Sequence, residues 1–158
     1  MKKLVALFLT VVMMCSMVAC GNKEEVKEPE TVGEFLLQDF KSNPEGSAQE
    51  IADRLIQNEV LPFEPVTMPV EAGFLAGFDN VEITGFNEGV MFAPMMGTIP
   101  FVGYVFTLDD GADVDGFVQG LKDSANLRWN ICTEAEEMIA EAEGNTVFFV
   151  MCPKNFEE

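Results

Sequence analysis

The stretch EMIAEAEGNTVFFVMC, residues 137–152, decides the fold. It begins as an alternating run of apolar and acidic residues and ends in a wholly apolar run, residues 147–151. Gly144 and Asn145 lie between the two runs, a pair that favours a two-residue turn between antiparallel strands. The stretch therefore predicts a β-hairpin in which Cys152 faces Glu137. The run without a polar face is predicted to be the central, most buried strand of a sheet.

A second hairpin is predicted upstream of the first. Residues 89–95 and 100–108 are rich in β-branched and aromatic side chains, and a short connection joins them. Residues 81–86 also show the alternation of a strand, and the glycines in residues 85–89 indicate a bulge or a tight turn. We therefore expect about four strands in total, most of them antiparallel.

Three helices are predicted from their start signals. Thr31 with Glu34 and Ser47 with Glu50 have the spacing of a capping box, and an apolar stripe of helical period follows each pair. Asp113 is suited to cap a third helix that runs to about residue 125. The order of elements is thus helix, helix, hairpin, helix, hairpin.

This order predicts an α+β, two-layer domain. Because every apolar face must be covered, we expect a mostly antiparallel sheet built from two hairpins, with the helices on one face. Residues 61–69 contain three prolines, which exclude both a continuing helix and a central strand. A loop that packs through Leu61, Phe63 and Val66 is predicted there.

The N-terminal segment has the build of a signal peptide. Two lysines precede an apolar run, residues 4–12, that is too short to span a membrane. The tetrapeptide Met17-Val18-Ala19-Cys20 resembles the lipobox of bacterial lipoprotein precursors. This resemblance implies that residues 1–19 are removed and that Cys20 carries a diacylglyceryl group, whose two acyl chains give stable membrane anchoring. The alternative is ordinary secretion, with Cys20 as a core residue.

The segment after the lipobox is too polar to bury a core. Residues 20–30 are therefore predicted to be the lipidated cysteine and an acidic tether. Residues 31–158 are predicted to form a single domain, held by membrane lipid at the extracytoplasmic face of the cell membrane.

The charge balance is strongly acidic. The chain has 27 acidic and 9 basic residues, a net charge of −18. Binding to nucleic acid is excluded, because phosphate contacts need a basic surface. The acidity is also explained by solubility alone.

The sequence lacks the residues of common catalytic sites. It contains no histidine, which removes the usual general base and the usual zinc ligand. No serine lies in a nucleophile elbow, and no phosphate-binding glycine motif is present. We therefore expect a protein without enzymatic activity and without a cofactor.

The upstream hairpin is the candidate binding surface, together with the single tryptophan. Burial of these side chains in the core is the alternative interpretation. The candidate residues are Phe86, Met91, Met95, Met96, Phe101 and Trp129.

The sequence contains two candidate groups of metal ligands. Oxygen ligands that suit calcium cluster at Asp109, Asp110, Asp113 and Asp115, although helix capping and a solvated turn explain them more simply. Methionine and cysteine sulfurs suit Cu(I), which makes soft-metal handling the alternative function. It predicts at least three sulfurs around one point, with Met138 and Met151 as further candidates.

Cys132 and Cys152 are the remaining thiols that bear on the domain. An exported location permits a disulfide between them. In a regular hairpin, however, Cys132 lies about five residues beyond the pair of Cys152 and Glu137, too far for a bond unless the chain folds back. A disulfide and two buried free thiols both stay open.

Four phrases spread over the chain carry a resemblance to a known group. TVGEFLLQDF, APMMGTIPFVGYVF, RWNICTEAEEM and VFFVMCPKNFEE resemble small lipoproteins of anaerobic gut Firmicutes that carry a domain of unknown function. The resemblance implies no activity, ligand or site residue. We therefore expect a membrane-anchored lipoprotein that binds an envelope protein or a small ligand.

Overall fold

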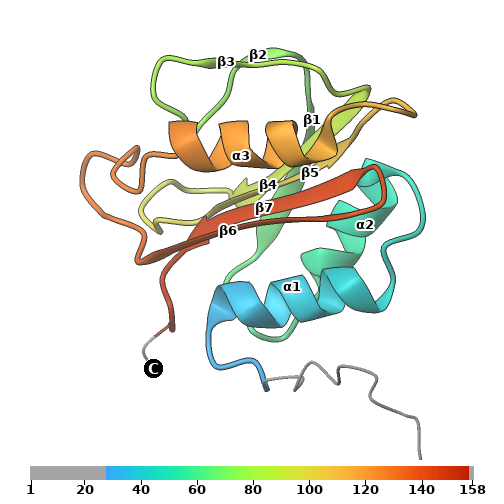
Figure 1. Cartoon of the computed structure of the whole chain (residues 1–158). Coiled ribbons are helices and arrows are strands. Elements are labelled where there is room, and N and C mark those ends of the chain that lie inside the picture. The colour runs from blue at the N-terminus through green and yellow to red at the C-terminus, as the bar shows by residue number, and fades with distance from the viewer. Residues whose placement is uncertain (1–27, 157–158) are drawn as a thin grey trace, which may run out of the picture.

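The computed structural model describes residues 28–156 (Figure 1). The signal peptide, Cys20 and most of the predicted tether lie outside these residues. The elements in chain order are α1 (Val32–Ser42), α2 (Ala48–Leu55), β1 (Pro65–Val70), β2 (Gly73–Phe74), β3 (Glu82–Ile83), β4 (Glu88–Pro94), β5 (Val102–Thr107), α3 (Val114–Ser124), β6 (Glu137–Glu143) and β7 (Thr146–Cys152). None of the helices among the described residues has the length and apolar character needed to cross a membrane.

The main sheet has five antiparallel strands in the order β1-β4-β5-β7-β6. Both predicted hairpins are present, β4 with β5 and β6 with β7. The turn at Gly144 and Asn145 and the pairing of Cys152 with Glu137 are confirmed. The burial predicted for β7 is confirmed, since its residues from Val147 to Cys152 are fully buried. Its predicted central place is wrong, because β5 is the central strand and β7 lies between β5 and the edge strand β6. The α+β class is thus confirmed, with five strands in this sheet where about four were expected.

The fifth strand, β1, corrects the prediction of a loop at residues 61–69. It pairs with β4 at the edge of the sheet. The hydrogen bond from Leu108 N to Asn145 O shows that the backbone N–H of Leu108 points toward β7. Backbone groups point alternately to the two sides of a strand, so the registers of β5 with β4 and of β4 with β1 show which β1 residues point toward β4. By this pattern Pro65 and Pro69 face away from β4, so neither proline removes a ladder bond. Prolines exclude a central strand but not this edge position.

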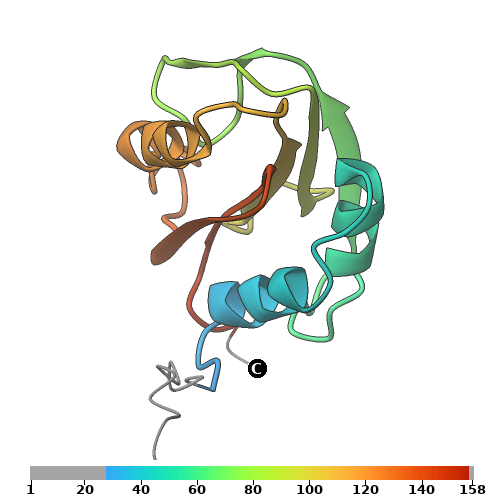
Figure 2. The ribbon, with the colours of Figure 1, turned by 45° about the vertical axis from the view of Figure 1, so that its right-hand side comes forward.

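The helices lie on both faces of the sheet, which corrects the expectation of one covered face (Figure 2). α1 and α2 pack through Leu36, Phe40 and Ile51 on one core. α3 packs on the other core, where Leu121 contacts the side of the sheet that carries Tyr104. Because β5 and β7 are apolar on both faces, each face needs its own cover.

A short ribbon corrects the strand predicted at residues 81–86. Only Glu82 and Ile83 are in strand conformation there, and they pair with Gly73 and Phe74 of β2 in a separate two-stranded sheet. The ribbon lies above α3 in Figure 1. The segment that contains it therefore covers part of the α3 face and adds no strand to the main sheet.

Two glutamates on strands hold the starts of α1 and α2. Glu137 of β6 accepts hydrogen bonds from Gly33 N at 2.9 Å and from Thr31 Oγ1 at 2.9 Å. Glu88 of β4 accepts bonds from Ala48 N at 3.0 Å and Gln49 N at 3.4 Å. Each carboxylate satisfies amide groups that a helix start leaves free and lies at the positive end of the helix dipole. The pairs fix α1 and α2 on the sheet.

The predicted helix caps are confirmed. The Thr31 side chain accepts from Glu34 N, and the Asp113 side chain accepts from Gly116 N. Ser47 and Glu50 form a complete capping box. These local bonds explain why the helix starts were readable from the sequence.

Candidate binding surface at the turn between β4 and β5

The structure divides the six predicted surface residues. Phe101 is 2% exposed and belongs to the α1/α2 core, so its prediction as a surface residue is wrong. Phe86, Met91 and Trp129 are half-buried against the α3-side core. Met95 and Met96 are 74% and 77% exposed. The six residues therefore do not form one surface. Of the six, only Met95 and Met96 are largely exposed.

The exposure of the methionines follows from where pairing stops. The ladder between β4 and β5 ends at Phe92 and Gly103. Pro94 has no N–H to extend it, and residues 95–101 leave the sheet as a turn. Bonds from Thr98 N to Met96 O and from Phe101 N to Ile99 O tighten this turn.

A groove of about 370 Å³ lies beside the two methionines. Phe63 is held in it by edge-on contacts with the rings of Phe101 and Phe156, at centroid distances of 5.2 and 5.5 Å. The predicted packing role of Phe63 is thus confirmed, and this ring also gives the groove a fixed apolar wall. The lining residues are Phe63, Glu64, Pro94, Met95, Met96, Thr98 and Ile99.

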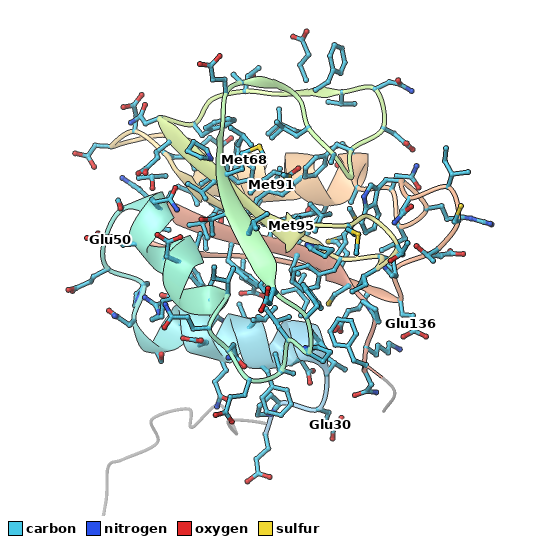
Figure 3. All side chains as sticks on the ribbon, turned by 180° about the vertical axis from the view of Figure 1, so that it is seen from behind. Glu30, Glu50, Met68, Met91, Met95 and Glu136 are labelled. Atoms are coloured by element: carbon cyan, nitrogen blue, oxygen red, sulfur yellow. The ribbon has the colours of Figure 1, made fainter. Side chains whose placement is uncertain are left out.

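A second loop extends this surface. Asn130 Nδ2 donates to Gly97 O at 2.6 Å, which ties the loop after α3 to the turn. Ile131, the next residue, is 96% exposed. We call the surface formed by Met95, Met96, Ile131 and the adjoining groove the methionine tip. In Figure 3 the labelled Met95 lies between Met91 and Glu30, the latter close to the point where the described chain starts.

The groove of the methionine tip has an acidic residue in its lining and no basic residue. Residues 89–108 contain no charged side chain, in a chain of net charge −18. Glu64 is the charged residue that lines the groove, and neither lysine nor arginine lines it. Arg128, in the loop that carries Ile131, pairs with Glu134 at 3.5 Å.

The four aspartates proposed for calcium do not gather into a site. Asp109 accepts from Asn87 at 2.6 Å, Asp110 accepts from Asn145 at 2.9 Å, and Asp113 caps α3. Asp115 lies in the first turn of α3. Across residues 28–156, no three His, Cys, Asp or Glu side chains are placed to hold a metal ion. The aspartates act instead as loop and helix anchors.

The sulfurs proposed for Cu(I) are distributed over the sheet. Met138 is opposite Met151 on β6 and β7, while Met91 is opposite Met68 on β4 and β1. Strand β5 separates these two pairs. Met95 lies beyond the ladder, in the turn. The register therefore offers no support for a site shared by all of them.

The cysteines form no disulfide with each other. Cys132 is exposed and Cys152 is buried, so the alternative of two buried thiols is wrong for Cys132. Cys152 Sγ donates to Glu137 Oε1 at 3.4 Å. Burial, and then the charge of Glu137, raises the pKa of the Cys152 thiol far above its ordinary value. Cys152 is thus an unreactive core thiol.

Tyr104 is a second group whose acidity the fold changes. Its ring is fully buried on the α3 side of the sheet, and its hydroxyl donates to Ala76 O at 2.9 Å. Burial raises the pKa of Tyr104 well above the ordinary value. The phenol is a structural donor.

Sequence reasoning missed the residues of the methionine tip that lie outside the upstream hairpin. Phe63 and Glu64, from the segment predicted to be a loop, line the groove. Ile131 lies in a loop with no periodicity that would assign it to a face. Its place beside the turn depends on the bond between Asn130 and Gly97, a contact between residues 33 positions apart. No local signal in the sequence predicts such a contact.

The chain was also compared with known proteins. No protein-family model, curated protein or solved structure matches it.

Proposed function

We propose that the protein is a lipid-anchored, extracytoplasmic binding module without enzymatic activity, and that the methionine tip is its binding surface. The exposure of Met95 and Met96 beside an apolar groove carries this proposal. Large apolar side chains that a fold leaves together at the surface mark interaction sites.

The anchoring part of the proposal rests on the N-terminal sequence. Cys20 follows an apolar run and a small residue, and a polar segment separates it from α1. A diacylglyceryl group on Cys20 holds the domain close to the membrane, so that its concentration near envelope partners is high.

The absence of catalytic groups supports a binding role. The chain has no histidine, and within residues 28–156 the two groups with a strongly changed pKa, Tyr104 and Cys152, are buried core donors. Catalytic groups with changed pKa values lie in accessible clefts instead.

Photo-crosslinking in intact cells tests the binding role. A photoreactive phenylalanine at position 96 is expected to give a discrete crosslinked product with an envelope protein. The matched control is the same group at position 74, since Phe74 is 70% exposed on β2, away from the tip. The absence of a product from position 96, or identical products from both positions, would contradict the proposal.

A further inference from the structure

We propose that the partner of the methionine tip is a polypeptide segment that is both basic and amphipathic, with one or two large apolar side chains flanked by Lys or Arg. This inference rests on the proposed binding function and names the chemistry of its partner.

The shape of the tip selects the apolar part of the partner. A groove of about 370 Å³ takes one or two large side chains rather than an extended hydrophobic face. Phe63 provides a fixed wall, because two other aromatic rings hold it. Met95 and Met96 are flexible and polarizable, so they adapt to the inserted side chain. A rigid wall with adaptable rims suits a helix or loop that projects apolar anchors.

The charge of the tip selects the basic part of the partner. Glu64 is among the residues that line the groove, and no lysine or arginine lines it. The described arginine nearest in sequence to Ile131 is Arg128, and Glu134 already pairs with it. The net charge of −18 attracts a basic segment at long range and repels an acidic one.

The same charges argue against two other occupants. A second copy of the chain has the same net charge of −18, so the two copies repel each other as they approach. Anionic lipid head groups are repelled for the same reason. A groove that includes an acidic residue in its lining is also a poor fit for a flat bilayer. A basic amphipathic segment can place its apolar side chains in the groove, and the negative charge of the chain attracts its basic side chains.

Three designed peptides of about 16 residues test the inference, a length at which an isolated helix is marginal and forms on binding. The first peptide is basic and amphipathic, with Lys and Leu. The second is equally basic but replaces Leu by Ser, and the third keeps Leu but replaces Lys by Glu. Titration of the full chain, with Cys15 and Cys20 replaced by serine, measures the three dissociation constants. The first peptide is expected to bind at least about tenfold more tightly than either of the others, and less tightly at high salt.

Variants connect this binding to the methionine tip. Met95→Ser/Met96→Ser is expected to weaken the first peptide about tenfold, and Glu64→Gln about twofold to threefold. Phe74→Ser, an exposed apolar residue elsewhere, is expected to leave the dissociation constant unchanged. Circular dichroism establishes that each variant is folded.

Several results would overturn the inference. These are equal binding of the acidic peptide, equal binding of the serine peptide, or no effect of Met95→Ser/Met96→Ser. Binding of the chain to vesicles of neutral lipid through the tip, lost in that double variant, would also overturn it in favour of a lipid surface. If position 96 crosslinks in cells to a segment without basic residues, the binding function stands and the inference fails. If position 96 gives no product, the binding function itself fails.

Discussion

Gly103 shows how closely the core of the sheet is packed at the scale of single residues. It is opposite Phe92 in the β4–β5 ladder, and the Phe92 ring lies where a side chain at position 103 would begin. Phe92 is fully buried and packs against Phe101 and Phe148, so it has no room to move away. A glycine is required here because of close packing.

We therefore expect Gly103→Ala to lower the free energy of unfolding by about 1–3 kcal/mol, the range for an overpacked core. Urea denaturation measures this change. The matched control is Gly120→Ala on α3, where an added Cβ meets nothing within 4 Å. That variant is expected to stabilise the domain by up to about 1 kcal/mol through helix propensity. Equal effects of the two variants would show that the Phe92 contact is wrong.

The two described cysteines are expected to differ sharply in reactivity. In a chain with Cys15 and Cys20 replaced by serine, a thiol reagent should modify Cys132 at once and Cys152 only after unfolding, because Cys152 is buried. The raised pKa of Cys152 keeps the thiol protonated as the pH rises through the ordinary thiol value of 9.0. Alkaline solution alone should therefore not make Cys152 react with the reagent. Mass spectrometry counts the labels. Two labels on the folded chain, or none after denaturation without reductant, would contradict this assignment.

Residue environments were only partly predictable from the sequence. The pairing of Cys152 with Glu137 followed from a turn of known length. The burial of Phe101 did not, because the segment from Phe101 into β5 is apolar on both sides and alternation cannot assign a face to it. Ile131 reaches the candidate site through a contact between distant loops, which local patterns do not encode.

At the scale of elements, the starts of α1 and α2 depend on carboxylates from the sheet. Hydrogen bonds to a charged acceptor contribute more than neutral ones. Glu137→Ala is expected to cost about 1.5–3 kcal/mol, because it leaves Gly33 N and Thr31 Oγ1 without this acceptor. Glu88→Ala is expected to cost about 1 kcal/mol, the size of a helix-cap loss.

The matched control for these two variants is Glu143→Ala, also on β6. Its carboxylate makes no side-chain hydrogen bond within the part of the chain that the structure describes, and its loss should change stability by less than about 0.5 kcal/mol. Urea denaturation compares the three variants. A loss for Glu143→Ala as large as that for Glu137→Ala would rule out helix anchoring as the cause.

Sequence reasoning succeeded for elements whose signals are local. Caps, turns and periodicity predicted all three helices and both hairpins. It failed for β1, because Pro65 and Pro69 argue against a strand unless their outward orientation is known. It also failed for the side on which α3 packs, since the path of the chain after β5 decides that, and no residue in α3 encodes it.

At the scale of the whole molecule, both edges of the main sheet are protected from further strands. The outer edge of β1 carries Pro65 and Pro69, which offer no N–H. At the other edge, α1 and α3 pack against β6, and Ala140 in its centre is 2% exposed. Strand addition is thus disfavoured at the β1 edge by the two prolines, and we propose the methionine tip as the surface that a partner contacts.

The proposed location of this acidic domain, at the membrane, depends on lipid anchoring at Cys20. Its most direct test is metabolic labelling with palmitate, combined with membrane fractionation of the wild-type chain and of Cys20→Ala. We expect label and membrane association for the wild type, and loss of both for Cys20→Ala. An unlabelled, full-length chain in the cytosol would contradict the account.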